Sequence, residues 1–318
     1  MRKNKILIIK TGYSEVLDRE SNSRKVSFGD ILRITPLLHV YKNDSVTWVS
    51  DENAFPLLEN NPYISRLLPL DWIVSEQLKA EEFDKVINLE KIPGICALAD
   101  SIRARRARYG FTFNSQTGGV EAYDKSGEVI EVSYDIKLKR ENKRTAQAHL
   151  FEMVGEKWNG EEYVLGYTPK TKEKYTVGLN TQVGQKWPTK SWADKNWDRL
   201  EEMLKEDCTS VSRQDKQDNR VLRNLYEYMD WINSCKTIVT NDSLGLHVAI
   251  ALKKKVLGLF GATPHAEVYF YERGKAILPE PVPDCLPCFE SVCGRGHNCL
   301  EDITPERVLN EIRKYAGS

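Results

Sequence analysis

The sequence predicts an α/β protein made of two Rossmann-like domains, and two observations lead to this class. Short apolar strand patterns alternate with helix patterns in both halves of the 318-residue chain, and this order builds parallel sheets. A charged, proline-containing stretch, TPKTKEK at 168–174, separates the halves and reads as a linker. We therefore expect one domain at 1–168 and a second at 169–318, each long enough to bury a core.

The composition is that of a soluble globular protein, with 41% hydrophobic and 29% charged residues. The 46 basic and 46 acidic residues give a formal net charge of zero, which argues against a general nucleic-acid binder. No apolar run approaches the roughly 20 residues of a membrane span. The N-terminal MRKNK leads directly into the strand pattern ILIIK, which is too short for a signal-peptide core, so we expect a cytoplasmic protein.

The first half reads as a doubly wound α/β unit. Lys5–Lys10 is a continuous apolar run between lysines, typical of a buried parallel strand. The polar residues 13–26 follow as an inserted loop, and a helix opens at 28–30 (FGD). Further strand patterns at 45–50 and 83–89 complete the alternation that predicts a parallel sheet.

The most informative segment is Thr237–His265, which reads as strand, turn, helix and strand. The polar turn 241–245 (NDSLG) lies where the first strand ends and the helix begins. Such a turn brings backbone N–H groups and the positive end of the helix to one point, which suits an anion, most often a phosphate. Asp242, Ser243 and His247 can add side chains there. A plain helix cap and a structural histidine are the alternatives.

A second loop, TQVGQKWPTKSW at 181–192, follows the predicted strand Tyr175–Asn180. It presents Lys186 just before Pro188, and the next helix has Trp197, Leu200 and Leu204 on one apolar face. An ordinary surface lysine is the alternative reading of Lys186.

Four cysteines lie close together in DCLPCFESVCGRGHNC at 284–299. We call them the cysteine cluster: Cys285, Cys288, Cys293 and Cys299. Cysteines in a cytoplasmic chain are expected as thiols or metal ligands rather than disulfides. Four sulfur ligands would suit a structural zinc or iron ion, but a zinc site usually pairs two C-x-x-C knuckles and one is present here. Packed thiols and a structural metal therefore both stay open, and neither implies a catalytic role.

Several of these segments together resemble glycosyltransferase family nine, the bacterial heptosyltransferases. The resemblance is carried by VSFGDILRITPLL at 26–38, by the lysine and tryptophan before Pro188, and by TNDSLGLHVAIAL followed by LFGAT. Most members have Asp-Ser/Thr-Gly-Leu-Met-His and Phe-Gly-Pro-Thr at the last two. Here Leu244 and Gly245 stand in swapped order, and Ala262 replaces the proline.

The resemblance implies the GT-B fold, in which two Rossmann-like domains face each other across a cleft. It also implies that the last helix, 304–316, crosses back to the first domain. The implied activity is inverting transfer of a sugar from a nucleotide donor, most often ADP-heptose, to a saccharide or glycolipid acceptor. No cofactor is needed for this catalysis, and a peripheral contact with the inner membrane would suit a glycolipid acceptor.

The resemblance also assigns candidate site residues. Asp30, next to Gly29, falls on the catalytic base of the family, although a helix-start carboxylate stabilised by the dipole is the alternative. Lys186 falls on the lysine that contacts the donor phosphate, with Lys190 as the other candidate. The expected donor-binding residues are Asp242, Ser243, Leu244, Gly245 and His247, and Arg213 is a candidate for contacting the nucleoside.

Two other functions stay open. The same fold hosts nucleotide-sugar epimerases, and it also hosts non-catalytic relatives that bind a sugar or a metal, because fold alone does not decide function. A dehydrogenase is disfavoured, because no G-x-G-x-x-G follows the strand Lys5–Lys10.

Overall fold

The computed structural model describes residues 3–13, 26–184, 187–215 and 222–316. It divides into two compact units, Met1–Tyr167 and Thr168–Ser318. Within the described residues, none of the helices has the length and apolar character needed to span a membrane.

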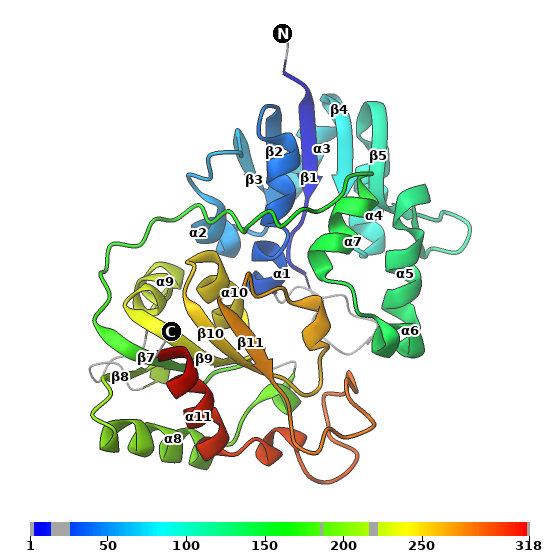
Figure 1. The fold of residues 1–318 in the computed structure, drawn as a ribbon. Helices are drawn as coiled ribbons and strands as arrows, with labels where there is room; N and C mark the ends of the chain where they lie inside the picture. Colours follow the sequence, from blue (N-terminus) through cyan, green and yellow to red (C-terminus); the bar gives the residue numbers. More distant parts are fainter. Residues whose placement is uncertain (1–2, 14–25, 185–186, 216–221, 317–318) are drawn as a thin grey trace. The chain divides into compact units, whose positions relative to one another are not determined.

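The first unit contains a six-stranded sheet with the order β3-β2-β1-β4-β5-β6 (Figure 1). Strands β1 to β5 are parallel, and β6 runs antiparallel to β5. The strands are β1 Lys5–Ile9, β2 Ser45–Ser50, β3 Arg66–Pro69, β4 Glu82–Asn88, β5 Arg103–Phe113 and β6 Val120–Ala122. The structure confirms the strands predicted near 5–10, 45–50 and 83–89, whereas the sequence analysis did not assign β3, β5 and β6.

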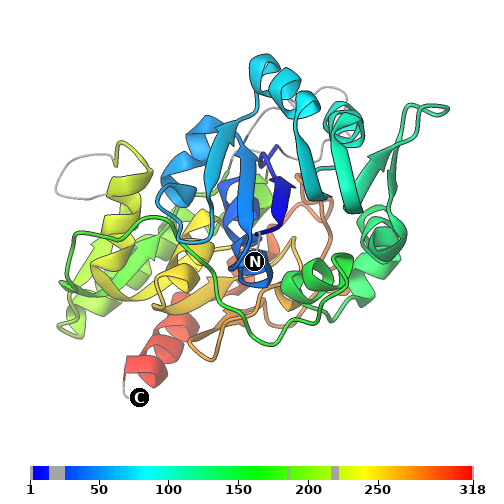
Figure 2. The same ribbon diagram turned by 90° about the horizontal axis from the view of Figure 1, so that it is seen from above.

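Helices lie on both faces of this sheet (Figures 1 and 2). They are α1 Phe28–Leu32, α2 Phe55–Leu58, α3 Trp72–Ala80, α4 Pro93–Ser101, α5 Gly127–Tyr134, α6 Ile136–Glu141 and α7 Ala146–Met153. A 3₁₀ segment, η1 at Thr35–Tyr41, follows α1. On one face, Val74 of α3 and Ile95 of α4 pack against Leu7 and Ile9 of β1. Ile6 and Ile8, which alternate with them along the strand, are also fully buried, and burial of both sides explains why β1 is apolar throughout.

The second unit contains a five-stranded parallel sheet with the order β11-β10-β9-β7-β8. The strands are β7 Tyr175–Asn180, β8 Val211–Arg213, β9 Cys235–Asn241, β10 Lys255–Leu259 and β11 Gly274–Ile277. The helices are α8 Asp194–Glu206, α9 Leu225–Asn233, α10 Leu244–Ala251 and α11 Pro305–Ala316. The structure confirms the predicted strands β7, β9 and β10 and the predicted helices α8, α10 and α11.

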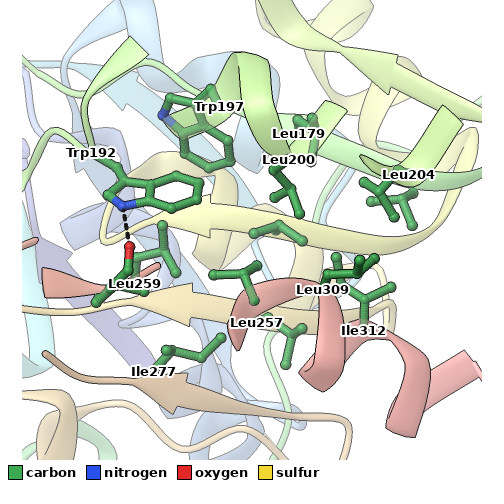
Figure 3. Packing of buried hydrophobic residues seen from close by; sticks show 14 of the residues in the cluster. Leu179, Trp192, Trp197, Leu200, Leu204, Leu257, Leu259, Ile277, Leu309 and Ile312 are labelled. Atoms are coloured by element: carbon green, nitrogen blue, oxygen red, sulfur yellow. Dashed lines mark hydrogen bonds between the residues drawn. The ribbon is translucent and has the colours of Figure 1, made fainter. Parts of the chain in front are cut away.

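The core of the second unit lies where α8 and α11 pack on the sheet (Figure 3). The predicted apolar face of α8 is confirmed, since Trp197, Leu200 and Leu204 are buried. Trp192 lies edge-on to Trp197, with ring centroids 4.8 Å apart, and its Nε1 donates to the carbonyl of Ile303 at 2.9 Å. The apolar face of α11 packs into this cluster. A crossing of this helix to the first domain stays a prediction.

Helix α10 is apolar on every side, and residues 245–250 are all buried. A short helix of this kind is held by its surroundings rather than by an amphipathic stripe. Its N-terminus is therefore fixed at the carboxyl end of β9, which is the edge of the sheet where ligands bind in open α/β folds.

Candidate functional site

The candidate site lies at the carboxyl edge of the second sheet, around the start of α10. Asn180 ends β7 and Asn241 ends β9, and the two strands are neighbours. Asn241 fixes the loop after β7 by donating to the carbonyl of Thr181 at 2.9 Å and accepting from the N–H of Trp192 at 3.1 Å. The two neighbouring parallel strands thus bring two polar loops together at one edge, as expected of a binding edge.

A largely but not fully buried ion pair links these two loops. Lys190, in the 3₁₀ segment η4 (Pro188–Lys190), donates from Nζ to Asp242 Oδ2 at 2.7 Å. Thr263, after β10, donates from its hydroxyl to the same oxygen at 2.5 Å. The side chains of Lys190 and Asp242 are 17% and 13% exposed. The pair therefore holds a cation and an anion side by side next to the start of α10.

The Asp242 carboxyl is kept ionised by its neighbours. Burial disfavours its charged form, but the attraction of Lys190, the hydrogen bonds from Lys190 and Thr263, and the nearby His247 outweigh burial and hold the pKa of Asp242 below its ordinary value. His247 itself lies buried in α10. The structure thus brings together Asp242, His247 and Lys190, three of the residues proposed from the sequence.

Ser243 caps α10, and a buried chain of polar groups stands behind it. Its Oγ accepts from the N–H of Gly245 at 3.3 Å and from Nδ2 of Asn180 at 2.9 Å. Asn180 also donates to Thr240 Oγ1 at 2.8 Å and accepts from the Tyr228 hydroxyl at 2.6 Å. Burial raises the pKa of Tyr228, so the phenol stays protonated and remains a donor.

Gly245 is needed where it stands. A Cβ at this position would lie 2.4 Å from Asn180 Nδ2 and 2.7 Å from the Tyr228 hydroxyl oxygen. Both partners are buried, so neither can easily move away. The order Leu244-Gly245 therefore places the glycine against Asn180, while Leu244 remains half-buried.

Two further candidates come from the second half of the sequence. Lys186 lies outside the described residues. Arg213 ends β8, and its side chain is 3% exposed. It donates to Asp198 at 2.5 Å and to Asp215 at 2.8 Å, with Glu201 at 3.6 Å. These carboxylates already account for the buried guanidinium, and a role of Arg213 in nucleoside binding stays a prediction.

Asp30 lies in the first turn of α1, directly after Gly29, in the first domain. Its side chain is 40% exposed and forms an ion pair with Arg33, whose Nε lies 3.3 Å from Asp30 Oδ1. The carboxylate is accessible and close to a cation, as either a base or a helix-start carboxylate would be. Its role as the base stays a prediction.

A buried carboxylate that the sequence analysis did not identify fixes the chain after β1. Glu90 is fully buried, and its Oε1 accepts from the N–H groups of Thr11 and Gly12, both at 2.8 Å. Lys10 Nζ lies 3.2 Å from the same oxygen. The carbonyl of Gly12 in turn accepts from the N–H of Ser27 at 2.5 Å, the residue that precedes α1. This chain of contacts ties the start of the helix that carries Asp30 to the sheet.

The cysteine cluster does not form a metal centre in the part of the chain that the structure describes. No group of three or more His, Cys, Asp or Glu side chains there is arranged to hold a metal ion. The four thiols are free, and burial together with the neighbouring thiols raises the pKa of Cys299 to about 11. The structural zinc or iron ion that the sequence left open is therefore not supported.

The segment that carries the cysteine cluster forms hydrogen bonds with two loops of the candidate site. The N–H of Phe289 donates to the carbonyl of Ala262 at 2.8 Å, and the Thr189 hydroxyl donates to the carbonyl of Glu290 at 2.6 Å. Asn298 donates to the carbonyl of Ser191 at 3.1 Å. The segment thus holds both the loop that carries Lys190 and the turn after β10.

Comparison with known proteins shows that the segment around β9 and α10 is similar to a known enzyme family. Residues 222–298 match the model of glycosyltransferase family 9 (heptosyltransferase). Two curated relatives, both lipooligosaccharide heptosyltransferase 2 of Campylobacter jejuni, are 31% identical over 83 residues (serotype O:6) and 29% identical over 80 residues (serotype O:2). These alignments cover 26% and 25% of this chain and the same shares of the relatives, so about a quarter of each relative is matched.

Solved structures match over both domains. Escherichia coli ADP-heptose lps heptosyltransferase II has a TM-score of 0.66 at 17% identity, with 98% of both chains covered. E. coli heptosyltransferase WaaC with ADP has a TM-score of 0.62 at 16% identity, also with 98% of both chains covered. A family 9 glycosyltransferase from Veillonella parvula has a TM-score of 0.63 at 16% identity, covering 100% of this chain and 98% of that chain. The expected α/β fold and the resemblance are thus confirmed: the chain shares its fold with these glycosyltransferases, and its residues 222–298 are similar to glycosyltransferase family 9 (heptosyltransferase).

Proposed function

We propose that the protein is an inverting glycosyltransferase that moves a sugar from a nucleotide donor, heptose from ADP-heptose, to a hydroxyl of a saccharide or glycolipid acceptor. One observation carries the proposal. The largely buried Lys190–Asp242 pair and the Ser243 cap meet at the N-terminus of α10, and Asp242 and Ser243 lie in the segment that matches the heptosyltransferase family. Two structural relatives are E. coli heptosyltransferase WaaC with ADP and E. coli ADP-heptose lps heptosyltransferase II, which supports ADP-heptose as the donor.

The chemistry of the donor site follows from the charge that develops during transfer. As the glycosidic bond breaks, negative charge grows on the diphosphate of the leaving nucleotide. The N–H groups at the start of α10 and the positive end of the helix would stabilise that charge. Lys186 and Lys190 would add cationic groups, in place of a divalent metal ion. Losing one preorganised donor of this kind commonly costs about 3 kcal/mol of transition-state stabilisation.

Asp30 of the first domain is the proposed base. It would accept the proton of the acceptor hydroxyl as the hydroxyl oxygen attacks the anomeric carbon opposite the leaving diphosphate. Attack from that side inverts the configuration of the sugar. The exposed carboxylate beside Arg33 and the tether from Glu90 through Gly12 to Ser27 support this role.

The experiment is performed in two steps with the 318-residue chain. Thermal-shift and calorimetric titrations with ADP, UDP and GDP identify the nucleotide, because a bound ligand stabilises the folded state by mass action. ADP-heptose and a saccharide acceptor are then combined, and the product is analysed. We expect selective ADP binding and an inverted glycoside.

Other outcomes would point to the alternatives. Epimerised sugar from the donor alone would indicate a nucleotide-sugar epimerase. The absence of binding by any nucleotide would indicate a non-catalytic relative. A cytoplasmic location, a glycolipid acceptor and a contact with the inner membrane also stay proposals, and a vesicle flotation assay with and without anionic lipid tests the last.

A further inference from the structure

Asn180 and Tyr228 are buried and form a chain of hydrogen bonds that ends at the Ser243 hydroxyl. We propose that Asn180 and Tyr228 are positioning residues, which turn the hydroxyl proton of Ser243 toward the bound diphosphate. This inference rests on the proposed function, because it needs an anion at the start of α10.

The direction of each hydrogen bond can be worked out from the donors and acceptors present. Thr240 donates its single hydroxyl proton to the carbonyl of Asn241 at 2.7 Å, so Thr240 Oγ1 must accept from Asn180 at 2.8 Å. The amide nitrogen of Asn180 therefore faces Thr240 and, with its second hydrogen, Ser243. The amide oxygen of Asn180 faces Tyr228, so the phenol must donate at 2.6 Å.

With the hydrogen bonds in this direction, the Ser243 hydroxyl acts as an acceptor in the chain and keeps its own proton to donate. A hydroxyl has two lone pairs and one proton, and the Ser243 oxygen accepts from Asn180 at 2.9 Å and from the Gly245 N–H at 3.3 Å. Thr240 Oγ1, at 3.4 Å, is at the long limit of a hydrogen bond. The Ser243 proton is therefore available to a phosphate oxygen, and the lone pairs that would repel that oxygen are engaged.

Burial keeps the chain in this arrangement. Asn180 is fully buried and Tyr228 is 8% exposed. The Tyr228 ring stacks on Trp231 with centroids 6.0 Å apart, and Trp231 Nε1 donates to Ser212 Oγ at 2.9 Å. Tyr228 therefore cannot turn its hydroxyl elsewhere without breaking the packing of α9.

Gly245 completes the arrangement. A Cβ there would lie 2.6 Å from Asn180 Cγ, which is closer than real side-chain contacts, so another residue would push the amide off Ser243. The glycine at 245, rather than at 244, is thus explained by the position of Asn180.

The test is a double-mutant cycle that measures ADP affinity by calorimetry. We expect Ser243→Ala to weaken ADP binding ~10- to 100-fold, as for loss of a hydrogen bond to a charged group. Tyr228→Phe removes one oxygen and should weaken binding about 3- to 10-fold. The double variant should bind no more weakly than Ser243→Ala alone, because Tyr228 acts through Ser243. A merely structural role of Tyr228 would instead give additive losses.

Matched variants keep the result interpretable. Tyr41→Phe removes a hydroxyl from another buried tyrosine, in the first domain, and should leave ADP affinity unchanged. Gly245→Ala provides a second route if Tyr228→Phe fails to fold: it should weaken binding through Asn180, and again not additively with Ser243→Ala.

The outcomes separate the two proposals. Failure of the wild-type protein to bind ADP would overturn the proposed function. Wild-type binding with full affinity in Tyr228→Phe, or with additive losses in the double variant, would overturn the positioning role and leave the proposed function standing.

Discussion

Replacing Lys190 by methionine should destabilise the second domain, because it leaves the Asp242 carboxylate without its cation. The two charged atoms lie 2.7 Å apart, and the side chains are 17% and 13% exposed. At an effective dielectric constant of about 20, such charges attract by about 6 kcal/mol, and desolvation of both groups cancels much of this gain. Breaking a fully buried pair costs roughly 3–5 kcal/mol. The Lys190–Asp242 pair keeps some exposure to water, and Asp242 would keep its hydrogen bond from Thr263. We therefore expect a loss of stability near the lower end of this range, about 3 kcal/mol.

Thermal melting followed by circular dichroism measures this effect. About 3 kcal/mol corresponds to a fall in melting temperature of roughly 6–12 °C for a domain of this size. The same Lys190→Met change in an Asp242→Asn background should cost about 1 kcal/mol or less, since no buried charge is left unpaired.

A surface ion pair in the same domain is the control for this melting experiment. Lys195 lies 3.2 Å from Glu301 and is 71% exposed, so Lys195→Met should melt close to the wild type. Equal destabilisation by Lys190→Met in both backgrounds, or a wild-type melting temperature, would refute the reasoning.

Three further predictions concern the base, the acid stability and the cysteines. Asp30→Asn should lower transfer ~10²- to 10⁴-fold with unchanged ADP affinity, and full transfer would exclude Asp30 as the base. The folded-state pKa of Asp242 is depressed, so its stabilising effect is present above the unfolded value of about 3.9 and is lost as the pH falls through the folded value. Melting temperatures of Asp242→Asn should therefore fall less steeply than those of the wild type on acidification below pH ~5, and parallel curves would contradict this. Dialysis against a chelator should leave the melting temperature unchanged, whereas a fall that added zinc or iron reverses would reveal a structural metal at the cysteine cluster.

Elements with a strong periodic pattern could be predicted from the sequence. The apolar run at Lys5–Lys10 and the spacing of Trp197, Leu200 and Leu204 each specify one way of burying their side chains. The short strands β3 (RLLP) and β11 (GKAI) have four residues each, too few to show a period. Their place in the sheets depends on the strands beside them, which the local sequence does not specify.

The candidate site could be predicted where local chemistry marks it. Asp242 and Ser243 stand in a polar turn between a strand and a helix, a context that suits either an anion or a helix cap. Asn180 and Tyr228 carry no such mark. Asn180 is 63 positions away from Ser243 in the sequence, and Tyr228 is 48 positions away from Asn180. Only the pairing of β7 with β9 and the packing of α9 bring these residues together. Glu90 reaches Thr11 and Gly12 in the same way, through the pairing of β1 with β4.

The most direct test of the account is a calorimetric titration of the 318-residue chain with ADP, alongside UDP and GDP. In the proposed function, the nucleotide diphosphate binds at the Ser243-capped start of α10. We therefore expect saturable, selective binding of ADP that Ser243→Ala weakens ~10-fold or more. Undiminished ADP affinity in Ser243→Ala, or no binding of any nucleotide by the wild-type protein, would contradict it.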